Sequence, residues 1–205
     1  MNSFDTITSA VTHEIKIKGS RFIGYAAPVQ TKEEAEAILE SIRKTHFSAT
    51  HHCYAYRLNP DGLEFRFNDD GEPSGTAGRP ILDAIESRGL FRVMCVVIRY
   101  FGGTKLGTGG LARAYQQSAA ETLDLGERIQ RRLYRKARLL FGYEWTGAIM
   151  SLLDKHTCRV IESRYDSDTE LHVLIPEKTA AAFETQCTDA TQGKVRTQWE
   201  GNCYD

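Results

Sequence analysis

Residues 93–113 of the chain read VMCVVIRYFGGTKLGTGGLAR. The stretch Val93–Tyr100, apolar over its first six residues, predicts a buried strand, and Gly109 or Gly110 predicts the start of a helix that extends to about Leu125. The loop between them is rich in glycine, which leaves backbone amides accessible at the N-terminus of the following helix. The stretch therefore predicts a strand, a loop and a helix that together form an anion-binding site.

A second glycine-rich segment, NDDGEPSGTAGRP, occupies residues 68–80. We expect both segments to supply residues of this site. Hydroxyl, amide and cationic groups beside a helix N-terminus favour phosphate, although the glycine spacing differs from that of a nucleotide P-loop. Alternatively, the glycines only permit a tight connection from strand to helix. The predicted phosphate-binding or nucleic-acid-binding residues are Arg79, Arg99, Thr104, Lys105, Gly107, Thr108, Gly109, Gly110 and Arg113.

The segment 68–80 also carries three carboxylates. Mg²⁺ commonly uses one or two carboxylates plus a ligand phosphate, so magnesium is the one cofactor considered for this segment. We favour the interpretation that the carboxylates orient Arg79 or Lys105 through charge-assisted hydrogen bonds, because no dedicated metal motif is present. No cofactor and no metal ligand is assigned. The predicted supporting acidic and polar site consists of His51, Asp69, Asp70 and Glu72.

The tripeptide His51-His52-Cys53 invites a metal or nucleophile interpretation. On a strand, His51 and Cys53 share one face and His52 takes the other, so the three side chains do not converge on one ion. Alternation places Cys53 on the apolar face, where the thiol is not activated. No catalytic residue is therefore assigned.

The rest of the N-terminal half predicts alternating strands and helices. Two strands turn at Lys18-Gly19 within residues 13–29, and Thr31 begins a capping box before an amphipathic helix over residues 32–45. Residues 52–56 and 65–67 alternate as a hairpin around Asn59-Pro60-Asp61-Gly62. A helix after Pro80 is expected to end near Gly89.

From residue 131 the pattern restarts in the order β-α-β-β-α-β, which is the split βαβ arrangement of ferredoxin-like domains. The stripe Trp145, Ile149, Leu152 and Leu153 is expected to face the core, with Trp199 packed against it. A boundary is expected after Gly126, because a charged run follows. The predicted fold class is α+β, with two-layer domains over residues 1–127 and 128–205, a division that suits a chain of 205 residues.

The charged run at the boundary, residues 128–138, reads RIQRRLYRKAR and holds six cations in eleven positions. Its arginines could bind phosphates while Tyr134 stacks on a base. Alternatively, the run is an ordinary solvated face. Both interpretations remain open, and Arg131, Arg132 and Arg135 are included among the predicted nucleic-acid-binding residues.

Composition excludes several classes of protein. A net charge of −1 argues against a globally basic nucleic-acid binder, and the longest apolar run, six residues, is far below the roughly 20 needed to span a bilayer. The N-terminus lacks the features of a signal peptide, so a cytoplasmic location is expected. The five cysteines form no C-x-x-C pair, which predicts reduced thiols.

Residues 20–23, 51–56, 69–78 and 100–111 resemble, in that order, the YigZ/IMPACT family. The resemblance covers roughly the first 125 residues. It implies an N-terminal domain similar to the second domain of ribosomal protein S5 and a C-terminal ferredoxin-like domain similar to the last domain of elongation factor G. It also implies a link to translation, since the eukaryotic members are connected with control of translation initiation through the pathway that activates an initiation-factor kinase.

Three functional hypotheses follow. The first is a non-enzymatic cytoplasmic protein that binds RNA, a ribosome or a translation factor and acts in translation or its regulation. The second is an enzyme that acts on a phosphorylated small molecule or nucleotide held by the glycine-rich loop. The third is a protein-interaction module whose glycine-rich loops only shape a surface. The oligomeric state does not follow from the sequence.

Overall fold

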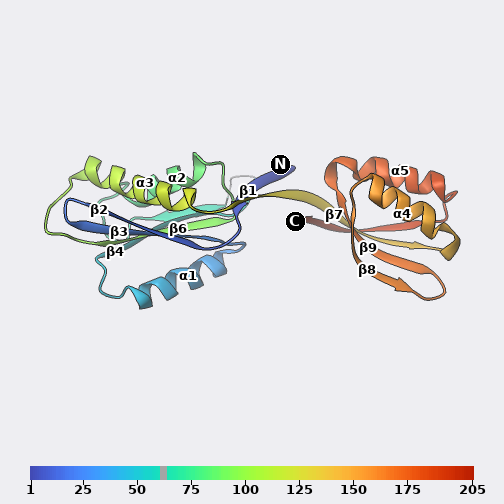
Figure 1. Cartoon of the computed structure of the whole chain (residues 1–205), viewed down its shortest axis with the longest axis horizontal. Coiled ribbons are helices and arrows are strands. Elements are labelled where there is room, and N and C mark those ends of the chain that lie inside the picture. The colour runs from blue at the N-terminus through green and yellow to red at the C-terminus, as the bar shows by residue number, and fades with distance from the viewer. Residues whose placement is uncertain (61–63) are drawn as a thin grey trace. The chain divides into compact units, whose positions relative to one another are not determined.

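The computed structural model describes residues 1–60 and 64–205 and shows a mixed α+β protein (Figure 1). The predicted hairpin turn at residues 59–62 lies partly outside the described residues. In chain order the described elements are β1 (Ser3–Ile7), β2 (Val11–Ile17), β3 (Ser20–Pro28), α1 (Lys32–Thr45), β4 (His51–Arg57), β5 (Phe65–Asn68), α2 (Gly78–Glu86), β6 (Val93–Tyr100), α3 (Thr108–Asp124), β7 (Arg128–Phe141), η1 (Tyr143–Trp145), α4 (Thr146–Lys155), β8 (Arg159–Tyr165), β9 (Thr169–Pro176), η2 (Glu177–Thr179), α5 (Ala180–Ala190) and β10 (Arg196–Tyr204).

The chain divides into two compact units. The N-terminal unit consists of Phe4–Gln130, and the C-terminal unit consists of Arg131–Asp205 together with Met1–Ser3. Residues 1–3 belong to the C-terminal unit because the Leu133 amide donates a hydrogen bond to the carbonyl oxygen of Asn2, at 2.8 Å. The Tyr204 hydroxyl likewise donates to the carbonyl oxygen of Met1, at 2.9 Å.

The sheet of the N-terminal unit has the strand order β2-β3-β6-β4-β5, with β6 antiparallel to both of its neighbours. Helices α2 and α3 cover one face and α1 covers the other, so this unit has three layers and the prediction of a two-layer domain is wrong for it (Figure 1). Cys95 and Val97 of β6 enter the core below α2 and α3, whereas Val96 and Ile98 enter the core below α1. The first six residues of β6 are all apolar because both faces of the strand are buried.

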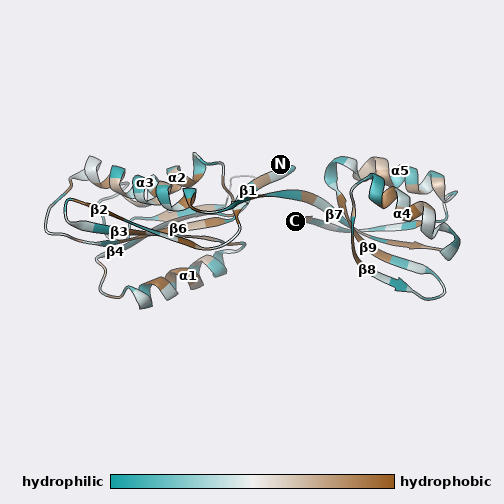
Figure 2. Cartoon of the chain, in the orientation of Figure 1, coloured by the Kyte–Doolittle hydropathy of each residue, from teal (hydrophilic) through white to brown (hydrophobic). Residues whose placement is uncertain are grey.

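Helix α1 illustrates how local sequence sets an element. The Thr31 hydroxyl accepts a hydrogen bond from the Glu34 amide, and the Glu34 carboxylate accepts one from the Gln30 amide. These bonds satisfy amides at the helix terminus. Hydrophobic residues lie on the side of α1 that faces the sheet (Figure 2). The predicted helix over residues 32–45 is confirmed.

The C-terminal unit contains β7, α4, β8, β9, α5 and β10 in the predicted order. Strand β7 lies between β10 and β9, β8 follows β9, and these pairs are antiparallel. Helices α4 and α5 lie on one face (Figure 1). Ile149 and Leu153 are buried below them, and Trp145, Leu152 and Trp199 pack against this core, so the predicted stripe is confirmed.

Two strands differ from expectation. The sequence did not predict β1, and β7 begins at Arg128, three residues before residue 131, from which the C-terminal pattern was predicted. The charged run at 128–138 lies on β7 and therefore has an extended backbone. No helix in the described part of the chain is long and apolar enough to cross a membrane.

Candidate functional site

The glycine-rich loop leads directly into α3 and leaves the first turn of that helix open. Gly107 is the N-cap residue, with φ 70°, and no side chain forms a capping hydrogen bond there. Thr108, Gly109 and Gly110 form the first turn, which contains no acidic side chain. The first amides of a helix have no intrahelical acceptor, so those of this turn are available to an anion. Thr104 lies exposed in the preceding loop.

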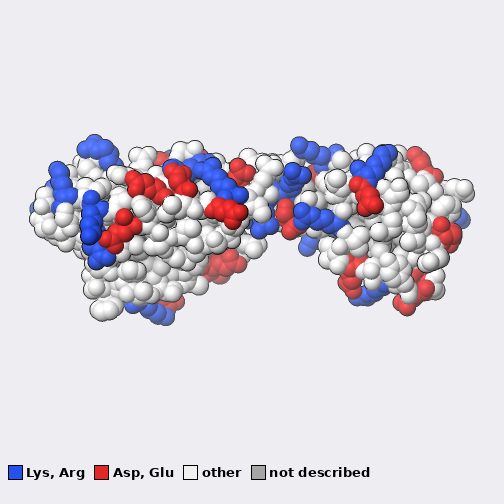
Figure 3. Space-filling model, viewed as in Figure 1, with Lys and Arg blue, Asp and Glu red and all other residues white. Residues whose placement is uncertain are grey.

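Three cations surround this helix N-terminus. Arg113 folds back over the first turn, since a Cβ added to Gly109 would lie 3.6 Å from Arg113 Nη1. Arg113 and Lys18, from the turn between β2 and β3, line the same hollow of about 300 Å³, to which Leu106 also contributes. Lys105 is exposed next to Leu106. Figure 3 shows basic side chains at the left-hand end of the molecule, where Figure 1 places this turn and the loop before α3.

A close backbone contact fixes the start of the loop. A Cβ added to Gly102 would lie 1.9 Å from the carbonyl carbon of Gly19, a distance that no side chain tolerates. The Gly102 amide also donates to the Ser20 hydroxyl, at 3.1 Å. The β2–β3 turn therefore holds the loop against the end of the sheet, and glycine is required at both positions of the contact.

Arg99 is placed differently from our expectation. Its side chain is only 6% exposed, and Nη1 donates to Glu72 Oε1 at 2.5 Å. The hydroxyl of Tyr115, from α3, donates to the same oxygen at 2.8 Å. Nη2 lies 3.4 Å from the hydroxyl of Ser20, whereas Nε has no hydrogen-bond partner among the described residues. Arg99 therefore ties the loop before α2 to the sheet instead of facing the glycine-rich loop from outside.

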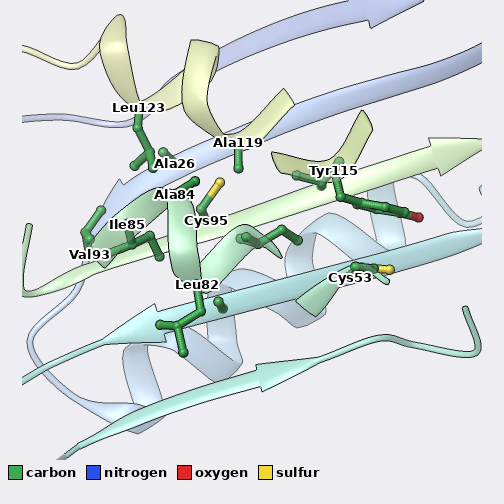
Figure 4. Packing of buried hydrophobic residues seen from close by; sticks show 14 of the residues in the cluster. Ala26, Cys53, Leu82, Ala84, Ile85, Val93, Cys95, Tyr115, Ala119 and Leu123 are labelled. Carbon is green, nitrogen blue, oxygen red and sulfur yellow. The ribbon is translucent and has the colours of Figure 1, made fainter. Parts of the chain in front are cut away.

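His51 and Cys53 line the same polar cluster. His51 Nδ1 donates to the carbonyl oxygen of Asp70 at 2.8 Å, and Nε2 faces Glu72 Oε1 at 3.8 Å. Cys53 is fully buried, and its thiol donates to the carbonyl oxygen of Asp69 at 3.0 Å. Figure 4 shows the Cys53 sulfur and the Tyr115 hydroxyl at the same end of the apolar cluster.

Burial controls the ionisation of this cluster. Burial raises the pKa of the Cys53 thiol well above its ordinary range, and the nearby carboxylates act in the same direction. Burial likewise raises the pKa of the Tyr115 hydroxyl, with contributions from Cys53 and Glu72. Both groups are therefore protonated at neutral pH, and Cys53 lacks the thiolate that a nucleophile needs. The expectation that Cys53 lies on an apolar face is confirmed.

The carboxylates of Asp69 and Asp70 accept hydrogen bonds from groups within the N-terminal unit. Asp69 accepts hydrogen bonds from the amides of Gly75, Ala77 and Gly78 at 2.8–2.9 Å, and so caps α2 from a distance. Asp70 accepts from the His52 amide and from the Arg43 guanidinium. Because these hydrogen bonds and this ion pair join Asp69 and Asp70 to residues 75–78, to β4 and to α1, they hold the segment 69–78 in one conformation.

The expectation that the acidic segment orients Arg79 or Lys105 is wrong. Arg79 pairs with Asp83 and Glu86 of its own helix, α2. Residues that are four and seven positions apart share one side of a helix, which explains this pairing. Lys105 has no ion-pair partner within the described residues. In the same part of the chain, no three His, Cys, Asp or Glu side chains are arranged to hold a metal ion.

The basic residues of β7 are divided by the strand's alternation. Arg135 stacks on Trp199, with 3.9 Å between its guanidinium carbon and the ring centroid, and lies 3.8 Å from Glu177. Arg132 is exposed and Arg131 is half-buried. These side chains belong to the C-terminal unit and do not form one continuous face.

Sequence reasoning missed Lys18, Ser20 and Tyr115. Lys18 carries a sequence signal, because it precedes Gly19 in the predicted turn between two strands, close in sequence to the candidate site residue Ser20. Ser20 and Tyr115 carry none, since their roles depend on partners far away in the sequence.

Two family models match different parts of the chain. Residues 18–123 match the family model of the Impact N-terminal domain, and residues 139–194 match a domain of unknown function, DUF1949. The "IMPACT family member YvyE" of Bacillus subtilis is 40% identical over 95% of this chain and 89% of its own length. The "IMPACT family member YigZ" of Escherichia coli is 34% identical over 96% and 97%.

A eukaryotic relative matches only in part. Mouse "Protein IMPACT" is 35% identical over 47% of this chain and 32% of its own length. One solved structure, described as the crystal structure of a hypothetical protein, is 34% identical and has a TM-score of 0.70. The match covers 96% of this chain and 97% of that chain, so it includes both units.

Proposed function

This chain belongs to the IMPACT family, and from that premise we propose that it is a non-enzymatic cytoplasmic protein that binds RNA or a ribonucleoprotein surface in translation or its regulation. The glycine-rich loop and the N-terminus of α3 hold a backbone phosphate. Lys105, Arg113 and Lys18 provide the surrounding charge. The link to translation rests on the family resemblance.

One observation carries the proposal: a carboxylate accepts hydrogen bonds from the amides at the start of α2, whereas no side chain caps the start of α3. Asp69 supplies a carboxylate to the amides at the start of α2. Helix α3 has no such carboxylate, and Lys105 and Arg113 have no ion pair within the described residues. An uncapped helix N-terminus with unpaired cations beside it favours an external anion.

The basic residues of β7 are proposed as a second contact with RNA. Arg131 and Arg132 have no ion-pair partner within the described part of the chain, whereas Arg135 is partly engaged by Trp199 and Glu177. We therefore expect Arg131 and Arg132 to contribute more than Arg135. Phosphate contacts of this kind position a nucleic acid without reading its sequence.

We also propose the finer fold assignment and the domain division at 127/128. The antiparallel order β10-β7-β9-β8 with both helices on one face supports a ferredoxin-like C-terminal domain. The S5-like assignment of the N-terminal domain rests on the family resemblance. Because fold does not fix function, these assignments add nothing to the RNA proposal by themselves.

The enzymatic alternative needs a free carboxylate for Mg²⁺ or for proton transfer. Asp69, Asp70 and Glu72 already accept hydrogen bonds or pair with arginine within the N-terminal unit. This arrangement favours a structural role for the acidic segment. We therefore place the enzymatic hypothesis second.

The test is RNA binding across a salt series. Wild type and Lys105→Ala/Arg113→Ala are titrated with labelled single-stranded and hairpin RNA by fluorescence anisotropy, from about 50 to 200 mM salt. The matched control is Lys32→Ala/Lys44→Ala, which removes the same charge from α1 on the other face of the sheet.

The slope of log affinity against log salt measures the phosphate contacts. For a single strand, each lost contact lowers the slope by about 0.7, so the loop variant should lose about 1.4 and the control should lose nothing. A separate Arg131→Ala/Arg132→Ala variant tests β7. Absence of binding at low salt, or equal slopes in the loop variant and the α1 control, would overturn the proposal. The next experiment would then be a screen of phosphorylated small molecules with and without Mg²⁺.

A further inference from the structure

An exposed aromatic ring lies at the first position of the glycine-rich loop. Phe101 follows the last residue of β6, and 47% of its surface is accessible to solvent. It is followed by Gly102 and Gly103, which have no side chains to cover it. Because exposing a phenylalanine ring to water is unfavourable, an exposed ring beside a candidate binding loop is a candidate contact residue.

The backbone on both sides of this ring is fixed. The Phe101 amide donates to the Thr50 hydroxyl at 3.1 Å. The next amide, that of Gly102, donates to Ser20, and the backbone of Gly102 abuts that of Gly19. The base of the ring therefore has little freedom, and a ligand that contacts it loses little additional entropy on binding.

A buried cation also supports the ring. The guanidinium carbon of Arg99 lies 5.5 Å from the centre of the Phe101 ring, and the same guanidinium donates a hydrogen bond to Glu72. Arg99 is buried, whereas Phe101 is half exposed, so the ring lies between a fixed interior group and solvent. A cation over the face of an aromatic ring stabilises its position.

The unpaired cations lie within reach of the same ligand. Four residue steps separate Phe101 from Lys105, so their Cα atoms are at most about 14 Å apart. A short oligonucleotide can bridge that distance with a base at one end and a phosphate at the other. Aromatic rings beside cationic groups are the usual means of binding single-stranded nucleic acid.

We propose that Phe101 is a stacking platform for one base of a single-stranded RNA whose backbone phosphate is held by Lys105 and Arg113. This inference rests on the proposed function and adds the class of RNA. In duplex RNA the bases are stacked on one another and are not available to a side chain, so the preferred ligand is single-stranded. The stacking is tolerant of sequence, since every base has an aromatic face.

The test compares Phe101→Leu with a matched control, Phe65→Leu. Phe65 is 44% exposed. It pairs across the sheet with Arg57 of β4, and Arg57 pairs with Val93 of β6. Phe65 therefore lies at the Val93 end of β6, opposite the end that Phe101 follows. The eight residue steps from Val93 to Phe101 separate these levels by roughly 26 Å. The two substitutions therefore remove equally exposed rings from distant positions on the same unit.

The ligands are an oligoadenylate, the same oligomer with one abasic position at each site in turn, and a duplex. Phe101→Leu should bind the oligoadenylate about 5- to 150-fold more weakly, the range equivalent to ~1–3 kcal/mol per stacked base. Its salt slope should equal that of wild type, because no phosphate contact is lost. Phe101→Trp should retain binding, Phe65→Leu should behave as wild type, and an abasic position should weaken wild type more than Phe101→Leu.

The outcomes separate this inference from the proposed function. If wild type binds the oligomer, the Lys105→Ala/Arg113→Ala slope falls and Phe101→Leu still binds as wild type, the phosphate site stands and the stacking role is refuted. The stacking role also fails if Phe101→Leu weakens duplex binding equally, or if its salt slope changes, since either result would indicate damage to the loop. If wild type binds no RNA, both proposals fall.

Discussion

The buried pair formed by Arg99 and Glu72 allows a quantitative prediction. The two side chains are 6% and 4% exposed and lie 2.5 Å apart. Replacing either residue by methionine preserves most of the volume but leaves the other charge buried without its partner. Breaking a buried ion pair in this way costs about 3–5 kcal/mol of unfolding free energy. For Glu72→Met, the Tyr115 hydroxyl also loses its acceptor, which places that variant towards the upper end of the range.

The free energy converts into a melting temperature. Unfolding entropy is about 2.1 cal/mol/K per residue, or about 0.27 kcal/mol/K for the roughly 130-residue N-terminal unit. A loss of 3–5 kcal/mol should therefore lower the Tm of that unit by about 11–18 °C. Calorimetry and urea denaturation followed by circular dichroism measure the change. The matched control is Glu40→Ala, whose partner Lys44 is exposed and whose loss should change little.

The double variant Glu72→Met/Arg99→Met isolates the ion pair. Replacing both members by apolar residues is often nearly neutral, so the double variant should be more stable than either single variant. A cost below about 1 kcal/mol for Glu72→Met would refute the reasoning, because it would mean that the Arg99 charge is hydrated without its partner. Strictly additive losses in the double variant would refute it as well.

Three further predictions concern other parts of the molecule. Gly102→Ala should lower the free energy of unfolding by at least ~1–3 kcal/mol, because its Cβ would lie 1.9 Å from backbone atoms. Gly147→Ala, where nothing lies within 4 Å of the added Cβ on α4, should raise the free energy of unfolding by ~0.5 kcal/mol. Thermal melts of both variants measure these changes, and equal effects would contradict the prediction. Burial raises the pKa of Cys95 to about 12, so iodoacetamide at pH 8 should leave this thiol unmodified in native protein but not in urea, as read by peptide mass spectrometry. A hydrogen bond from Arg88 lowers the pKa of Asp124 below its ordinary 3.8, so its contribution to stability is present above that pH and is lost as the pH falls through the lowered value. Asp124→Asn should flatten that part of the acid denaturation curve, and an unchanged curve would show that the pair contributes nothing.

Much of the fold could be predicted because its signals are local. The capping box at Thr31 fixes the start of α1, and the unbroken apolar run from Val93 fixes β6. Strand β1 could not be found in this way. It is short, its buried positions do not alternate strictly, and β7, the strand beside it in the sheet, lies far along the chain.

The candidate site was predicted less completely, for a physical reason. Arg99 lies at even spacing from Cys95 and Val97 on β6, whose side chains enter the core below α2 and α3. What the sequence could not provide was its partner, because Glu72 comes from a loop 27 residues away and no local pattern links the two. The uncapped N-terminus of α3 followed from local glycines. That the start of α2 is capped did not, because its cap is Asp69, which lies nine residues before Gly78.

The membership of residues 1–3 in the C-terminal unit has a consequence for synthesis on the ribosome. Asn2 emerges long before Leu133, whose amide bonds to its carbonyl oxygen. Domains generally fold as they are made, so the unit Phe4–Gln130 can complete its core while residues 1–3 still lack their partners. Residues 1–3 are thus among the last residues of this chain to reach their native contacts, because the C-terminal unit joins segments that precede and follow Phe4–Gln130 in the sequence.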